Sequence, residues 1–161
     1  MTISEYNRCV DDFSDGIYRF LLKNTGNNEI AQDLVQESFM KLWIRRKEVN
    51  FKKSKSYLFS TAYHTMIDYI RKNERLTTLE GKEHHLEPED CHYSDLKEIL
   101  DMALGNLPEI QRTVVLLRDY EGYSYIEIGE ITGLSESQVK VYIYRARLFL
   151  KKYIVAPDYV I

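Results

Sequence analysis

The sequence predicts an all-α fold made of two small helical domains joined by a flexible acidic linker. Apolar residues recur every three or four positions along most of the 161-residue chain, and no stretch keeps the alternation of a β-strand. This spacing stops between residues 77 and 94 and then resumes. We therefore expect a first domain over 1–76, a linker over 77–94, a second domain over 95–155 and a tail over 156–161.

Three helices are expected in the first domain, because three apolar stripes are separated by residues that end or start helices. Gly26 follows the first stripe, Asn28 can cap the second helix, and Ser56 can cap the third after a basic loop. Three such helices can enclose one core. The stripes comprise Tyr6, Val10, Phe13, Ile17, Phe20 and Leu21; Ile30, Ala31, Leu34, Val35, Phe39, Leu42 and Trp43; and Leu58, Phe59, Ala62, Tyr63, Met66, Tyr69 and Ile70.

The segment after these helices is expected to be a linker, because it has too few apolar residues to offset the entropy lost on ordering. It contains Gly81 and Pro88, and residues 77–100 carry seven acidic and only two basic side chains. Helical spacing then resumes at Leu96. Pro108 suits the first turn of a further helix, which we expect to end before Gly122.

The last part of the chain predicts a helix-turn-helix. Ser124 with Glu127, and Ser135 with Gln138, both fit the capping-box pattern and mark two helix starts eleven residues apart. Gly133 lies between them, where a tight turn needs a positive φ. The two helices could be held together by Ile126, Ile131, Leu134 and Val139, with Gly129 allowing a close approach.

Charge is distributed in a way that favours nucleic-acid binding, although the net charge is −3. Residues 51–76 carry six basic and two acidic side chains, and residues 135–161 carry five and two. In a helix-turn-helix the second helix enters the major groove. The side chains that could contact DNA there are Ser137, Gln138, Lys140, Tyr144, Arg145 and Arg147. The alternative is an ordinary helical hairpin with a solvated basic face.

A second exposed face is predicted on the helix around Asp33. Asp33, Gln36, Glu37 and Met40 lie opposite its core stripe. A methionine exposed beside acids suggests a surface that docks a partner, although single exposed apolar residues are common. The residues alone leave both interpretations open.

Three segments together resemble bacterial sigma factors. AQDLVQESFMKLW (Ala31 to Trp43) resembles region 2.2, which binds core RNA polymerase. SYLFSTAYHTMIDYIRKNER (Ser56 to Arg75) resembles regions 2.3 and 2.4, which engage and melt the −10 element. LPEIQRTVVLLRDYEGYSYIEIGEITGLSESQVKVYIYRARLFL (Leu107 to Leu150) resembles region 4, which binds the −35 element. Two domains with a short linker resemble the extracytoplasmic-function (ECF) branch of the sigma-70 superfamily.

The resemblance implies a non-enzymatic adaptor that docks on core RNA polymerase and directs transcription from promoter DNA, with no cofactor. It also implies regulation by an anti-sigma factor, commonly a membrane-anchored one. Asp33, Gln36, Glu37 and Met40 would contact the coiled coil of the largest polymerase subunit. The loop 50–56 and His64 match the place where this branch captures a flipped base. The −10 and single-strand contacts would be Lys52, Lys53, His64, Arg71, Lys72 and Arg75, and the −35 contacts Ser137, Gln138, Lys140, Val141, Tyr144, Arg145 and Arg147.

The sequence departs from the family at two of these places. The family often has Asn where His64 stands, and Arg-Ser where Lys140 and Val141 stand. The second change removes an arginine guanidinium, which can donate two parallel hydrogen bonds, and a serine hydroxyl. No −35 sequence is therefore predicted.

Two other classes of protein fit parts of the sequence. A stand-alone helix-turn-helix regulator would leave the Asp33–Met40 face unexplained. A metal-dependent enzyme or sensor could use His84, His85, Cys91 and His92, but their spacing matches no tight ligand pattern, so no metal site is expected.

Cys9 and Cys91 have no CxxC partner, no run spans a bilayer, and no signal sequence opens the chain. We therefore expect a cytoplasmic protein that is not inserted in the membrane.

Overall fold

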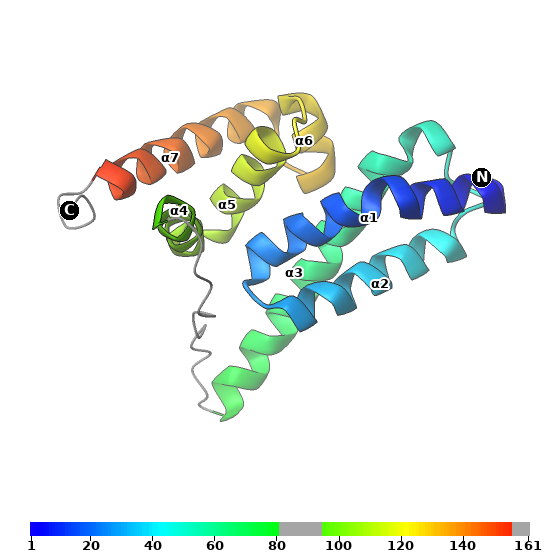
Figure 1. The fold of residues 1–161 in the computed structure, drawn as a ribbon, viewed down its shortest axis with the longest axis horizontal. Helices are drawn as coiled ribbons and strands as arrows, with labels where there is room; N and C mark the ends of the chain where they lie inside the picture. The colour runs from blue at the N-terminus through cyan, green and yellow to red at the C-terminus, as the bar shows by residue number, and fades with distance from the viewer. Residues whose placement is uncertain (81–94, 156–161) are drawn as a thin grey trace. The chain divides into compact units, whose positions relative to one another are not determined.

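The computed structural model describes residues 1–80 and 95–155, and all their regular structure is helical. The expected all-α fold is confirmed. The chain divides into two compact units, with the division between residues 87 and 88, inside the stretch that is not described (Figure 1). The elements are α1 (Ile3–Thr25), α2 (Asn28–Ile44), the 3₁₀ helix η1 (Phe51–Lys53), α3 (Ser54–Glu80), α4 (Asp95–Asn106), α5 (Glu109–Val115), the π-helical turn η2 (Leu116–Tyr120), α6 (Tyr125–Thr132) and α7 (Glu136–Val155).

In the N-terminal unit, α1, α2 and α3 pack against one another around a single core. Phe20 of α1 meets Phe59 of α3 edge to face, with ring centroids 5.7 Å apart. This geometry places the positive edge of one ring on the negative face of the other. The largest fully buried side chains of this unit are Ile17, Phe20, Leu21, Leu42, Leu58, Phe59 and Met66.

Two helices of this unit start earlier than predicted, α2 by one residue and α3 by three. Asn27, rather than Asn28, caps α2, because its extended backbone lets its side chain accept from the Ile30 amide at 3.1 Å. The Asn28 side chain instead accepts from the Tyr18 hydroxyl. The predicted cap Ser56 lies inside α3. The Asn50 side chain caps η1 instead, and η1 leads directly into α3 at Ser54.

Helix α3 continues through Glu80, beyond the predicted end of the first domain at residue 76. Thr77 and Thr78 are only modest helix formers, but no glycine or proline interrupts the chain before Gly81. The rest of the predicted linker, with the possible ligands His84, His85, Cys91 and His92, lies outside the described residues, as does the tail 156–161.

In the C-terminal unit, the long helix α7 packs against α4, α5 and α6. The predicted helix-turn-helix is present. Ser124 accepts from the Glu127 amide at 3.2 Å, and the Glu127 carboxylate accepts from the Ser124 amide at 2.9 Å. Ser135 and Gln138 make the same reciprocal pair at 3.2 and 3.0 Å. The core of this unit includes Leu104, Leu116, Leu117, Ile128, Ile131, Val139 and Ile143.

The turn between α6 and α7 depends on two glycines. Gly133 has φ +80°, as predicted for the helix end. A Cβ on Gly129 would lie 2.7 Å from the backbone oxygen of Leu134, so only glycine allows this close approach. One predicted contact is wrong: Ile126 is 60% exposed, and Ile128 faces the core instead, because the helix turns by about 100° per residue.

A buried tyrosine should make this unit sensitive to alkali. Tyr123 is 5% exposed, and burial, together with the charges of Glu121 and Glu127, raises the pKa of its phenol well above 10.0. A raised folded-state pKa means that stability is present below about pH 10 and is lost as the pH rises above it. We expect the Tm of the wild type to fall more steeply than that of Tyr123→Phe between about pH 9 and 11. Tm would be measured by circular dichroism at each pH. If Tm fell equally steeply with pH for both proteins, the result would contradict this expectation.

Candidate functional site

The first candidate surface is the solvent side of α2. Asp33, Gln36, Glu37 and Met40 are all exposed, Met40 by 56%. Ile44 lies four residues after Met40, hence on the same side of the helix, and is 71% exposed. Sequence reasoning missed Ile44, although its helical spacing from Met40 could have revealed it. We call these five residues the α2 face.

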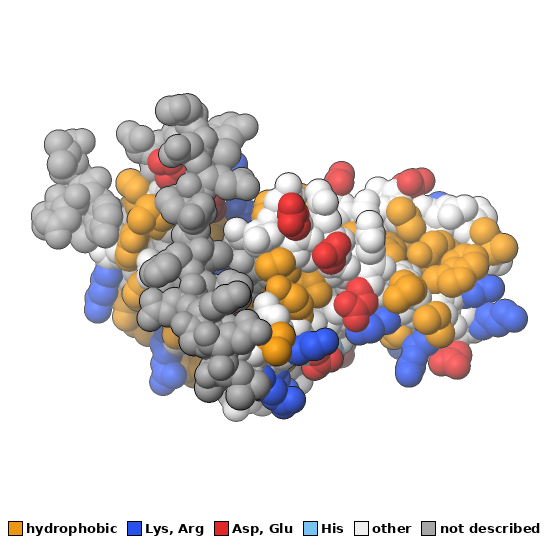
Figure 2. All heavy atoms as spheres, turned by 90° about the horizontal axis from the view of Figure 1, so that it is seen from below, with side chains coloured by type: hydrophobic (Ala, Val, Ile, Leu, Met, Phe, Trp, Pro, Cys, Tyr) orange, Lys and Arg blue, Asp and Glu red, His pale blue; other side chains and the backbone are white. Residues whose placement is uncertain are grey.

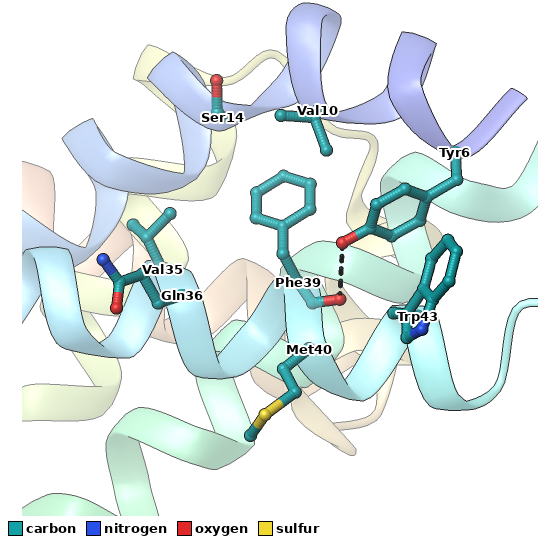
Figure 3. A pocket seen from close by; sticks show the side chains of 8 residues that line it. All are labelled: Tyr6, Val10, Ser14, Val35, Gln36, Phe39, Met40 and Trp43. Carbon is teal, nitrogen blue, oxygen red and sulfur yellow. Dashed lines mark hydrogen bonds between the residues drawn. The ribbon is translucent and has the colours of Figure 1, made fainter. Parts of the chain in front are cut away.

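A groove between α1 and α2 borders this face (Figure 3). It has a volume of about 480 Å³, and its floor includes Phe39. The Tyr6 hydroxyl donates to the Phe39 carbonyl at 3.0 Å and ties the two helices together. The groove is lined by Tyr6, Val10, Ser14, Val35, Gln36, Phe39, Met40 and Trp43.

Trp43 was predicted to be a core residue but is 37% exposed. Its ring meets Tyr6 edge to face at 4.9 Å, and the Arg46 guanidinium lies 3.9 Å above it. These two contacts cover part of the indole, which also lines the groove. The indole is thus an apolar surface available next to Met40.

The α2 face combines acidic and apolar chemistry. On the side of the N-terminal unit that Figure 2 shows, hydrophobic side chains lie next to acidic ones. Glu37 forms an ion pair with Lys41 at 3.4 Å, and Lys41 also donates to the Thr65 hydroxyl of α3 at 2.9 Å. Such a surface complements a partner that presents both basic and apolar side chains.

The second candidate surface runs along η1 and α3. All six predicted single-strand contacts are exposed, and His64, Arg71 and Arg75 share one side of α3 at spacings of seven and four residues. The His64 ring packs at 5.2 Å against the buried Tyr63. In η1, which precedes α3 in the chain, the ring of Phe51 lies under the Arg8 guanidinium of α1, 5.0 Å from it. Arg8 was not predicted and adds a further cation beside the loop. The six residues are Lys52, Lys53, His64, Arg71, Lys72 and Arg75.

The third candidate surface is the exposed side of α7, where all seven predicted residues lie. A shallow hollow of about 190 Å³ is lined by the apolar side chain of Val141, which is 45% exposed, and by the basic side chain of Arg145. Tyr144 projects beside it and is 67% exposed. The hollow is lined by Ser137, Gln138, Val141, Tyr142 and Arg145.

Arg147 is exposed but engaged within the unit. Its Nε and Nη2 donate to the two carboxylate oxygens of Asp119 in η2, at 3.1 and 2.5 Å. This hydrogen bonding raises the pKa of Arg147. Because both side chains are partly exposed, the pair contributes about 1 kcal/mol at most to stability. Its main effect is to orient α7 against η2 and to use two of the five donors of Arg147.

Each of the two units matches a known protein family. The family model for Sigma-70 region 2 matches residues 9–76, and that for Sigma-70, region 4 matches residues 97–150. The ECF RNA polymerase sigma factor SigM of Bacillus subtilis is 32% identical over 157 residues, covering 94% of each chain. SigW of the same organism is 30% identical, covering 89% of this chain and 85% of SigW.

Solved structures show the same fold. The sigma factor RpoE from Bartonella quintana, in a co-crystal with the anti-sigma factor NepR, aligns with a TM-score of 0.84 at 22% identity, covering 96% of this chain and 99% of RpoE. CnrH, in complex with the cytosolic domain of CnrY, aligns with a TM-score of 0.69 at 21% identity. This alignment covers 94% of this chain and 88% of CnrH.

Two helical units, one with an exposed acidic and apolar face and one with a helix-turn-helix, are both matched by sigma-70 family models, so a stand-alone helix-turn-helix regulator is not favoured. The matches then assign both units to one lineage: the chain belongs to the ECF branch of the sigma-70 RNA polymerase sigma factors. It therefore directs promoter-specific transcription initiation. None of its described helices combines the length and the apolar character needed to cross a membrane.

Proposed function

We propose that the α2 face is the surface through which this sigma factor docks on core RNA polymerase, against the coiled coil of the largest subunit. The observation that carries this proposal is that two acids, one amide and two large apolar side chains lie exposed on one side of a single helix. Met40 and Ile44 leave 56% and 71% of their surface exposed to solvent. Binding a partner would remove their apolar surface from water.

The two basic surfaces would then contact promoter DNA. Along η1 and α3, Lys52, Lys53, Arg71, Lys72 and Arg75 would follow the phosphates of the −10 region, and His64 would lie against an extruded base of the single strand. On α7, the hollow around Val141 and Arg145 would face the major groove of the −35 element. Ser137 and Gln138 also line this hollow, and Lys140, Tyr144 and Arg147 would contact DNA beside it.

We also propose that an anti-sigma factor, commonly membrane-anchored in this branch, controls the protein. The complex of RpoE with the anti-sigma factor NepR, and that of CnrH with the cytosolic domain of CnrY, support this proposal, because both involve proteins of the same fold. The protein would act in the cytoplasm as an adaptor without catalytic activity of its own, and the polymerase would supply the chemistry.

Reconstituted transcription tests the proposal. The full-length chain would be added to purified bacterial core polymerase on a DNA library with randomised −10 and −35 positions. We expect transcripts from a selected promoter class only when the chain is present. Polymerase that binds the chain but initiates at random positions would contradict the proposal.

The exposed isoleucine of the α2 face allows a more specific test. We expect Ile44→Glu to weaken binding to core polymerase by about tenfold, because it places a charge where apolar surface would be buried. Ile126→Glu in the other unit is a matched control, because Ile126 is also exposed, by 60%. Equal core affinities of the two variants, measured by fluorescence titration, would exclude Ile44 from the interface.

A further inference from the structure

A tyrosine outside the predicted DNA contacts lies among three basic residues at the edge of α7. Tyr125 is the first residue of α6. The Arg118 guanidinium lies 4.5 Å from the centre of its ring, and the Lys140 ammonium lies 5.5 Å from it. The Tyr125 hydroxyl also contributes to raising the pKa of Arg147. This ring therefore connects η2, α6 and α7.

The backbone around Tyr125 is held firmly, so the ring has a defined position. The Ser124–Glu127 capping box fixes the start of α6 immediately before it. On the other side, Arg118 donates from Nη1 to the Tyr123 carbonyl at 2.9 Å while its guanidinium packs on the ring. A fixed aromatic face is an attractive site for a cation.

Lys140 is the cation that this ring can position for DNA. Its ammonium lies 5.5 Å from the centre of the Tyr125 ring and 3.3 Å from the Glu136 carboxylate, and its side chain is 55% exposed. Lys140 is not among the residues that line the hollow of α7, since its ammonium is turned towards α6. Lys140 thus lies at the edge of the exposed side of α7. At such an edge, a helix that lies in the major groove approaches the sugar-phosphate backbone.

We propose that Tyr125 is a positioning residue, whose ring holds the Lys140 ammonium ready to bind a phosphate of the −35 element. This inference rests on the proposed DNA-binding role of α7. The ring is uncharged, so it orients the ammonium without neutralising it, whereas Glu136 does neutralise it. A phosphate can replace Glu136 while the ring contact remains. A free lysine would lose side-chain entropy on binding, and prior ordering lowers that cost.

The experiment uses holoenzyme assembled from core polymerase and the full-length chain, with the promoter that wild-type holoenzyme selects from a randomised library. Affinity is measured at several salt concentrations for the wild type, Tyr125→Leu, Tyr125→Phe, Lys140→Ala and the double variant Tyr125→Leu/Lys140→Ala. Thermal melts of each variant show whether the helix-turn-helix remains folded.

We expect Lys140→Ala to lower the slope of log affinity against log salt by about one, the effect of one lost phosphate contact. Tyr125→Leu should weaken binding about two- to fivefold when Lys140 is present and have no further effect when it is absent. Tyr125→Phe retains the ring and should bind like the wild type. A merely structural role for Tyr125 would give the same loss in both backgrounds.

Three results would overturn the proposal. The first is an equal effect of Tyr125→Leu with and without Lys140. The second is a Tyr125→Phe variant as weak as Tyr125→Leu, which would assign the role to the hydroxyl. The third is a Lys140→Ala variant that relaxes the preference at one base pair with an unchanged salt slope. If wild-type holoenzyme instead selects no −35 sequence at all, the DNA-binding role of α7 itself fails, a result separate from these three.

Discussion

The double variant Asp33→Lys/Glu37→Lys is expected to lose binding to core RNA polymerase by on the order of 100-fold, while its fold remains intact. Both side chains are exposed, and surface substitutions of this kind change the free energy of unfolding by about 0.5 kcal/mol or less. In the proposed complex, however, two acids that meet a basic partner would become two bases. Like charges facing each other across an interface cost several kcal/mol. Titration of labelled protein with core polymerase measures the loss.

A matched control makes the same change in net charge at another place on the N-terminal unit. Asp12 and Asp15 are exposed on α1 and do not line the groove next to the α2 face. Asp12→Lys/Asp15→Lys should therefore bind core polymerase within about twofold of the wild type, apart from weak long-range electrostatics. If both double variants lost affinity to the same degree, net charge rather than the α2 face would govern the association.

Gly129→Ala is expected to give the largest loss of stability among single-methyl changes in the C-terminal unit. The new Cβ would lie 2.7 Å from the Leu134 carbonyl oxygen, and that oxygen is backbone, which cannot move aside alone. Relieving the overlap would force α6 away from the turn that leads into α7. The expected cost is about 1–3 kcal/mol. This corresponds to a fall in Tm of roughly 5–20 °C for a unit of this size.

Gly105→Ala provides the control, because Gly105 is also helical but a Cβ there meets nothing within 4 Å. Replacing a helical glycine by alanine without a clash should stabilise the unit by about 0.5–1 kcal/mol. Calorimetry of the full-length variants gives both shifts. Should Gly129→Ala melt at or above the wild-type temperature, the close approach of α6 to the Leu134 carbonyl would not be a constraint in solution. The proposed −35 surface would also not depend on it.

Short-range patterns in the sequence predicted much of the fold. The capping boxes at Ser124 and Ser135 and the turn at Gly133 involve residues at most four apart, so their chemistry is visible in a few letters. The exposure of the predicted α2 and α7 residues likewise follows from helical periodicity. The cap of α2 was misplaced by one residue, because Asn27 and Asn28 are chemically identical and only the backbone angles distinguish them.

Features that depend on distant parts of the chain could not be predicted. Trp43 is 37% exposed, and the part that is covered depends on Tyr6, which comes from another helix. Asp119 and Arg147 are 28 positions apart, and no local pattern links them. The same holds for the cations around Tyr125. The sequence therefore predicted which side chains are exposed on α7, but not which of them are already held by contacts within the unit.

The wide turn η2 has a consequence for how the C-terminal unit tolerates change. A π-helical turn contains one residue more than an α-helical turn, so everything beyond it is rotated by about 100° relative to a regular helix. Arg118 and Asp119 lie within this turn and reach Tyr125 and Arg147 from there. Deleting one residue here would restore a regular helix and aim both side chains elsewhere. Sequence length across 116–120 should thus be under selection as tight as that on the identities of Arg118 and Asp119.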